Sequence, residues 1–217
     1  MAAGGLTLPA DCVVPEIATG VVLFIHGQGS NRFSLRNQQV AACLQQAGLA
    51  TLLFDLLTPQ EQRQVADRGN GCAELPELTA RVLAVIDALT TIEPLAHLPV
   101  GLFGSSSGAA LALAAAAQRP RRIAAVVSRG GRPDLVLGVL GDVCCPTLLL
   151  VGSHDLDVLE LNTWAAAQLR GEHELRVVPG AGHLFAEPGA LELVSQWSLQ
   201  WFLQHLRRGP SANALQP

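Results

Sequence analysis

Six short apolar runs, separated by longer segments with helical spacing, limit what this chain can fold into. Several of the runs are apolar at every position, as parallel strands must be when helices cover both faces of their sheet. Alternation of such strands with helices predicts a three-layer α/β fold with a mostly parallel sheet. Weaker strands are expected near Leu6–Leu8 and around Val13. The six expected strands are Val21–Ile25, Ala50–Phe54, Val100–Phe103, Ile123–Val127, Thr147–Val151 and Leu175–Val178.

Amphipathic segments supply the helical layers on either side of this sheet. Neither a repeat nor a linker interrupts the alternation, so residues 1–206 are expected to form one domain without a cap domain. Residues 207–217 lack apolar periodicity, and we expect a flexible tail there. The expected helices include the stripes Val40–Ala47, Leu75–Leu89, Leu159–Leu169 and Leu191–Trp201.

The charge of the chain and the residue types that it lacks exclude several functions. The 217 residues carry a net charge of −4, and no basic run is longer than an arginine pair, which argues against nucleic-acid binding. All 14 basic residues are arginine, so no lysine is available for a Schiff base or a phosphate-binding loop. The absence of tyrosine removes a common phenolic acid.

Cysteine usage and the N-terminal sequence predict a cytoplasmic location. The five cysteines form no C-x-x-C motif, and we interpret them as reduced, mostly buried thiols. The N-terminal residues lack the basic and apolar regions of a signal peptide. The longest run of small apolar residues, Gly108–Ala117, is too short to span a bilayer, so no membrane association is expected.

Three consecutive serines follow a predicted strand in the sequence "FGSSSGAAL". The pattern G-x-S-x-G fits only one register, which places Ser106 at its centre between Gly104 and Gly108. A serine on a sharp strand-to-helix turn has a strained backbone, and the residues two positions away crowd it unless they lack a side chain. The alternative is an ordinary serine-rich turn with a helix N-cap. The pattern favours Ser106 as a nucleophile.

A second turn, "HGQGS", follows the strand Val21–Ile25. In a serine hydrolase this turn brings a backbone N–H to the developing oxyanion, which the N–H after the nucleophile also binds. The expected donors here are the amides of Gln28 and Ser107. A dinucleotide-binding loop is the alternative, but Arg32 stands where its third glycine would be. We interpret His26 as a structural residue beneath the loop.

An acid and a histidine follow the last two predicted strands. Asp155 lies in the loop after Thr147–Val151, and Asp157 competes with it, although Asp157 would also serve as a helix N-cap. His183 lies in the glycine-flanked loop "PGAGHLF". Because His154 and the two acids match no standard metal-site spacing, no metal is expected. The order Ser106, Asp155, His183 predicts a serine triad that needs no cofactor.

The chain resembles the α/β-hydrolases, and most closely the small lidless hydrolases of the dienelactone hydrolase family. The resemblance covers about Val21 to Glu192 and rests on the motifs "HGQGS", "GSSSG", "SRGGRPDL", "GSHDLDVLELN" and "PGAGHLFAEPGAL". It implies a hydrolase fold and the catalytic roles assigned above. Dienelactone hydrolases proper have cysteine at the turn where this chain has Ser106, a difference that favours ordinary carboxylic esters as substrates.

We therefore expect a carboxylesterase that cleaves short-chain esters through an acyl-enzyme intermediate. The preference for short chains rests on the expected absence of a lid. The chain between Ser128 and Thr147 has room for about one short helix, Leu135–Leu140, and Leu56–Cys72 is expected to be a polar loop without the apolar face of a lid. Arg32 and Arg129 are candidate substrate-binding residues, with surface ion pairs as the alternative. The competing functions are a lactone or thioester hydrolase, a non-catalytic binding protein on a hydrolase fold, and a nucleotide-binding protein. A homodimer is compatible with the sequence.

Overall fold

The computed structural model describes residues 1–68 and 74–206. Its main sheet has the order β3-β5-β4-β6-β7-β8-β9, and only β3 runs antiparallel to its neighbour. Every predicted strand is present, and the weak strand near Leu6 belongs to a separate two-stranded sheet. The strands are β1 Ala2–Ala3, β2 Leu6–Thr7, β3 Ala10–Val13, β4 Val21–Ile25, β5 Ala50–Phe54, β6 Val100–Ser105, β7 Ile123–Arg129, β8 Thr147–Gly152 and β9 His173–Val178.

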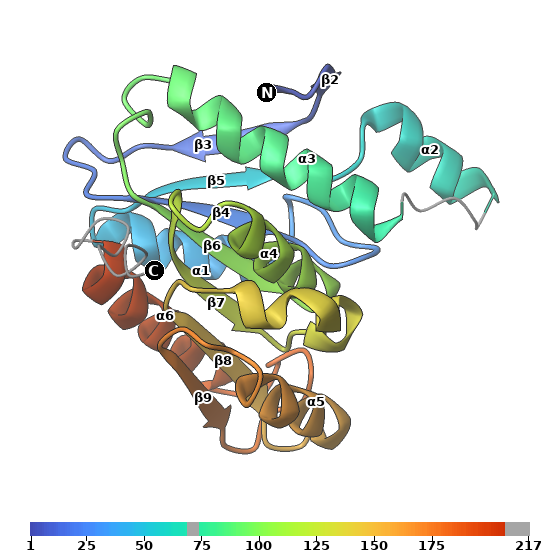
Figure 1. Ribbon diagram of the computed structural model, residues 1–217, viewed down its shortest axis with the longest axis vertical. Helices are drawn as coiled ribbons and strands as arrows, with labels where there is room; N and C mark the ends of the chain where they lie inside the picture. Colours follow the sequence, from blue (N-terminus) through green and yellow to red (C-terminus); the bar gives the residue numbers. More distant parts are fainter. Residues whose placement is uncertain (69–73, 207–217) are drawn as a thin grey trace.

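Helices cover both faces of the sheet, as the sequence predicts (Figure 1). Alternate residues of β4 enter different cores, with Leu23 packed on the side of α3 and α4 and Phe24 on the side of α1 and α6. No cap domain interrupts the described part of the chain. The helices are α1 Leu35–Gln46, α2 Pro59–Arg68, α3 Leu75–Ala88, α4 Ser107–Gln118, α5 Leu156–Ala166 and α6 Ala190–Leu206, with 3₁₀ segments at Leu89–Thr91 and Pro133–Asp142.

The expectation of a polar loop after β5 is wrong for most of that segment. Residues 59–68 form α2, which begins with a reciprocal pair of hydrogen bonds: the Thr58 amide donates to the Glu61 carboxylate at 2.7 Å, and the Glu61 amide donates to Thr58 Oγ1 at 3.3 Å. Pro59 occupies the first turn, where its missing N–H costs nothing. The letters "TPQE" therefore contain a capping box that predicts this helix start.

An ion pair joins α2 to α3. The Arg81 guanidinium, 6% exposed, donates from Nη2 to Glu61 Oε1 at 2.6 Å and from Nη1 to Glu61 Oε2 at 2.8 Å. Nη1 also donates to the Leu56 carbonyl at 2.8 Å, so one side chain holds both ends of the β5–α2 connection. The hydrogen bonds from Arg81 lower the pKa of Glu61 to about 2. A bidentate pair of this kind fixes the orientation of α2 as well as its position.

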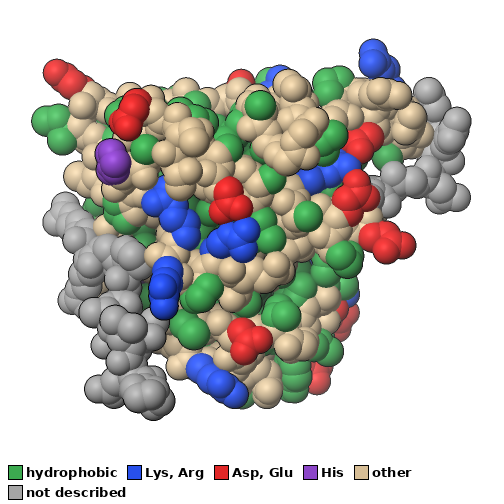
Figure 2. Space-filling view, turned by 45° about the horizontal axis from the view of Figure 1, so that its top comes forward, with side chains coloured by type: hydrophobic (Ala, Val, Ile, Leu, Met, Phe, Trp, Pro, Cys, Tyr) green, Lys and Arg blue, Asp and Glu red, His purple; other side chains and the backbone are tan. Residues whose placement is uncertain are grey.

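Other surface features differ in part from the sequence-based expectations. Cys12 and Cys144 are exposed rather than buried, and Cys72 and the predicted tail lie outside the described residues. On the face seen in Figure 2, Arg side chains lie beside Asp and Glu side chains. Within residues 1–68 and 74–206, none of the helices combines the length and apolar character needed to cross a bilayer.

Replacing Glu61 by Gln should remove an acid-dependent part of the stability. The folded-state pKa of Glu61 lies below its ordinary value of 4.5, so the stabilisation is complete above that value and is lost as the pH falls towards about 2. Gln keeps the capping role at this position, which isolates the effect of the charge. At pH 7 the urea concentration at the unfolding midpoint should be higher for the wild type than for Glu61→Gln. The difference between the two midpoints should become smaller as the pH falls from 4.5 to 2.5. Glu160→Gln, an exposed change on α5, is the control.

Candidate active site

Ser106 lies on the sharp turn between β6 and α4, with φ 53° and ψ −125°. A positive φ is unfavourable for a residue with a side chain, so the surrounding structure must hold it. The turn is crowded on both sides. A Cβ at Gly104 would lie 2.4 Å from the Ala109 Cα, and one at Gly108 would lie 2.3 Å from the Ile25 carbonyl oxygen. The two glycines are therefore required by backbone packing around the serine.

The turn after β4 lies against the serine. A Cβ at Gly27 would be 3.1 Å from the Ser106 Cβ, so glycine allows the loop to come this close. His26 holds the loop from below: the Leu56 amide donates to His26 Nε2 at 3.1 Å, and His26 Nδ1 lies 2.9 Å from the Gly27 carbonyl. Burial lowers the pKa of His26, which favours the neutral ring that this bonding needs.

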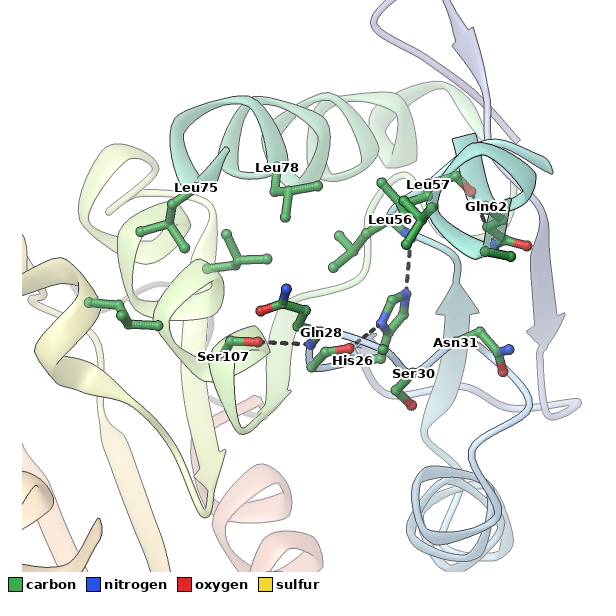
Figure 3. Close-up of a pocket in the computed structure, with 16 residues that line it drawn as sticks. His26, Gln28, Ser30, Asn31, Leu56, Leu57, Gln62, Leu75, Leu78 and Ser107 are labelled. Carbon is green, nitrogen blue, oxygen red and sulfur yellow. Dashed lines mark hydrogen bonds between the residues drawn. The ribbon is translucent and has the colours of Figure 1, made fainter. Parts of the chain in front are cut away.

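The backbone amide of Gln28 has a hydrogen-bond acceptor in the structure. It donates to the Ser107 hydroxyl oxygen at 2.8 Å, across 79 residues of sequence (Figure 3). The two residues expected to supply oxyanion donors are thus brought together.

The structure brings the predicted acid and histidine together as well. His183 Nδ1 lies 2.6 Å from Asp155 Oδ2, with the carboxylate side chain 14% exposed and the imidazole 40% exposed. Asp155 itself is the N-cap residue of α5, whereas Asp157 is exposed in the first turn, so the expected N-cap role of Asp157 is wrong. A Cβ at Gly152 would lie 2.2 Å from the Ala181 carbonyl, which shows how closely the histidine loop packs over the end of β8.

The end of β7 connects the serine to the histidine. The Ser106 amide donates to the Arg129 carbonyl at 3.1 Å. The next residue, Gly130, has φ 52°, and a Cβ there would lie 3.4 Å from His183 Cε1. Ser106 and the imidazole of His183 are therefore both placed against one short stretch of backbone. Within the described residues, no three His, Cys, Asp or Glu side chains gather into a cluster that could hold a metal ion.

The two candidate arginines have different surroundings. Arg32 pairs with Asp55 at 2.5 Å and with Asp11 at 3.1 Å, so its charge is compensated within the fold. Arg129 is 8% exposed and contacts the Asn37 side-chain oxygen at a long 3.4 Å, with its guanidinium over the Phe185 ring. Burial lowers the pKa of Arg129 to about 10.

A cavity of about 460 Å³ opens beside Gln28 and Ser107. Figure 3 shows Leu75 and Leu78 of α3 projecting toward these two residues. Sequence reasoning did not assign the cavity walls, although the capping box of α2 and the apolar stripe of α3 were visible signals for the elements that carry them. The apolar lining residues are Leu56, Leu57, Val65, Ala66, Leu75, Leu78, Leu111 and Leu135.

The parallel sheet and the sharp β6–α4 turn at Ser106 are typical of one class of protein. Sequence comparison identifies the same class. The family described as "alpha/beta hydrolase fold" matches residues 20–140, more than half of the chain. The chain belongs to the α/β-hydrolase family. It is similar to a dienelactone hydrolase from Anabaena variabilis, with 48% identity, a TM-score of 0.92 and 95% of each chain covered.

Two other comparisons extend this result. Est1E from Butyrivibrio proteoclasticus shares the fold, with a TM-score of 0.78 at 18% identity over 94% of this chain and 96% of that one. A Mycobacterium tuberculosis protein named "Putative phosphoribosyl transferase" is 50% identical over 96% of this chain. The chain spans only 46% of that relative's length, so the name describes a protein with a large part that has no counterpart here.

Gly108→Ala should destabilise the protein strongly. The new Cβ would overlap backbone atoms of Ile25 and His26, which cannot move without disturbing β4. Overpacking of this kind costs about 1–3 kcal/mol or more. Gly138→Ala is the matched control, because a Cβ there meets no atom within 4 Å among those described. Urea unfolding of both variants tests the comparison, and equal stabilities would contradict the crowding argument.

Proposed function

We propose that this protein is a serine hydrolase that cleaves carboxylic esters through an acyl-enzyme intermediate. The observation that carries the proposal is the 2.6 Å contact between His183 Nδ1 and Asp155 Oδ2. The imidazole lies against Gly130, and the preceding residue, Arg129, accepts the hydrogen bond of the Ser106 amide. An aspartate bound to Nδ1 leaves Nε2 free to accept a proton, which is the tautomer that a general base needs. The similarity to a dienelactone hydrolase over 95% of the chain supports the same reaction class.

The proposed reaction has two halves. His183 Nε2 takes the Ser106 hydroxyl proton while the serine oxygen bonds to the acyl carbon, and Asp155 stabilises the resulting imidazolium. The tetrahedral intermediate expels the alcohol oxygen, which receives the proton from His183. Water then attacks the acyl-enzyme with its proton going to His183, and the acid leaves as Ser106 regains its hydrogen.

The backbone amides of Gln28 and Ser107 are the proposed oxyanion donors. Because the Gln28 amide donates to the Ser107 hydroxyl in the free protein, a substrate oxygen must replace or share that acceptor. The backbone N–H of residue 107 at the start of α4 does not depend on its side chain. The hydroxyl is therefore proposed to be dispensable for the reaction.

Lactone or thioester hydrolysis would use the same residues and remains the nearest alternative. A non-catalytic binding protein is the alternative of a different class, and a fluorophosphonate probe distinguishes it, because only an activated Ser106 forms the covalent adduct. The name of the mycobacterial relative gives no support for phosphoribosyl transfer here, since this chain matches less than half of that protein. Arg129, buried and incompletely paired, is the stronger of the two arginine candidates for contact with a substrate.

Ser106→Ala should abolish ester hydrolysis and labelling by the fluorophosphonate probe. Ser105→Ala and Ser107→Ala should retain much of the wild-type kcat/KM, because neither change removes the nucleophile or a backbone donor. The measurement is hydrolysis of p-nitrophenyl esters, with circular dichroism to show that each variant folds. Full activity in a folded Ser106→Ala protein would end the serine-hydrolase hypothesis.

Asp155→Asn should cost far more activity than Asp157→Asn. The first change removes the acceptor for the His183 Nδ1 proton, and comparable losses in triad enzymes are about 10⁴-fold in kcat. The second alters an exposed side chain in the first turn of α5. A charge there contributes up to about 1 kcal/mol to helix stability and has no role in the proposed reaction, so kcat should change less than about fivefold. Steady-state kinetics of the two isosteric variants gives the ranking. The reverse order would assign the acid to Asp157.

A further inference from the structure

We infer that the cavity beside Gln28 and Ser107 is the acyl pocket of the proposed hydrolase and takes an apolar acyl group of about six to ten carbons. This inference rests on the proposed function. It differs from the expected short-chain preference, which assumed an uncovered pocket and, in part, a polar loop where the structure has α2.

The walls of the cavity favour an apolar occupant over a charged one. No Asp, Glu or Arg lines the cavity in the described part of the chain. Two of its polar residues are engaged elsewhere: the Gln62 side-chain amide donates to Asp55 and to the Leu57 carbonyl, and both ring nitrogens of His26 have partners. Four further polar residues also line the cavity: Gln28, Ser30, Asn31 and Ser107. The aliphatic part of the lining comes from the loop after β5, from α2, α3 and α4, and from the 3₁₀ segment Pro133–Asp142. An occupant gains there chiefly by burying its own apolar surface.

The position of the cavity decides which half of an ester it holds. Its lining includes Gln28 and Ser107, the proposed oxyanion donors, so the carbonyl oxygen of a bound ester lies at its mouth. The leaving alcohol must face His183, because that imidazole gives it a proton. Neither His183 nor Ser106 is among the residues that line the cavity, whereas Ser107, the residue after the serine, is. The alcohol therefore points away from the cavity and the acyl chain points into it.

The volume sets the size of the acyl group. A cavity of about 150 Å³ with aliphatic and aromatic walls is large enough to hold benzene, whereas this one measures about 460 Å³. An acetyl group would leave most of it to water. Each methylene that moves into the pocket contributes about 0.8 kcal/mol, or roughly fourfold in binding, until the available length is filled.

An ion pair fastens the α2 side of the cavity to α3. Val65 and Ala66 line the cavity from α2, and the bidentate pair between Glu61 and Arg81 ties that helix to α3. Leu78 lies on α3 itself, one turn before Arg81. The pocket is thus preformed between two helices that share a buried guanidinium.

The first test measures kcat/KM for p-nitrophenyl acetate, butyrate, hexanoate, octanoate and dodecanoate below their solubility limits. We expect a maximum at hexanoate or octanoate, at least about tenfold above acetate, since even two fully buried methylenes would give that factor. A maximum at acetate overturns the inference. Failure to hydrolyse any of the esters counts instead against the proposed function, and the binding measurement below then decides the inference.

A matched set of variants tests the pocket walls. Leu78→Trp fills the cavity, and Leu135→Trp does so from a position that is 42% exposed and so tolerates a larger side chain. Leu137→Trp, 52% exposed on the same 3₁₀ segment but absent from the lining, is the control. The first two changes should lower kcat/KM for p-nitrophenyl octanoate about tenfold and alter kcat/KM for p-nitrophenyl acetate less than about threefold. The control should leave both values unchanged. Equal losses for both esters overturn the inference.

Binding to folded Ser106→Ala protein separates the pocket from the chemistry. Calorimetric titration with octanoate should show affinity at least tenfold above that for butyrate, and Leu78→Trp in the same background should remove the difference. Equal affinity for the two acids in Ser106→Ala protein would overturn the acyl-pocket assignment even if esters are hydrolysed.

Discussion

The backbone of Ser106 is the constraint on which the candidate site depends. A residue at φ 53° persists only where its neighbours leave it no alternative, and here β4, β6 and α4 supply that packing. The packing that holds this strained backbone is possible because Gly27, Gly104 and Gly108 have no side chains. Each of these glycines lets one backbone segment approach another closely. The same close approach that strains the serine brings the Gln28 amide within hydrogen-bonding distance of the following residue.

The parallel sheet brings the Arg129–Gly130 backbone and the loops of Asp155 and His183 to the same edge as the serine turn. The carboxyl ends of neighbouring strands meet at one edge, which is where open α/β sheets bind ligands. Strands β6, β7 and β8 are adjacent, so the serine turn, the Arg129–Gly130 backbone and the Asp155 loop follow one another along that edge. The His183 loop returns over the end of β8 because Gly152 leaves room for it. The order of the strands in the sheet therefore determines which of these loops lie next to one another.

The outer walls of the cavity come from other elements than the proposed catalytic side chains, whereas Gln28, Ser107 and Leu111 line it on the side of the serine turn. The serine, acid and histidine follow β6, β8 and β9, whereas the cavity is closed by α2 and α3, which follow β5. Changes in those two helices can alter what the pocket accepts while the strand ends keep their geometry. The ion pair between Glu61 and Arg81 joins α2 to α3 and does not involve the turn at Ser106.

The sequence by itself determined the layered fold, the six parallel strands and the glycine-flanked turn at Ser106, since apolar periodicity and the spacing of glycines report local backbone requirements directly. It also contained the capping box of α2, which the polar composition of residues 56–72 obscured. Only the tertiary structure decided that Asp155 rather than Asp157 meets His183, that Ser107 accepts from Gln28, and that Arg32 is compensated by Asp55. These are contacts between segments far apart in the chain, and their distances depend on strand order and loop packing that no local pattern records.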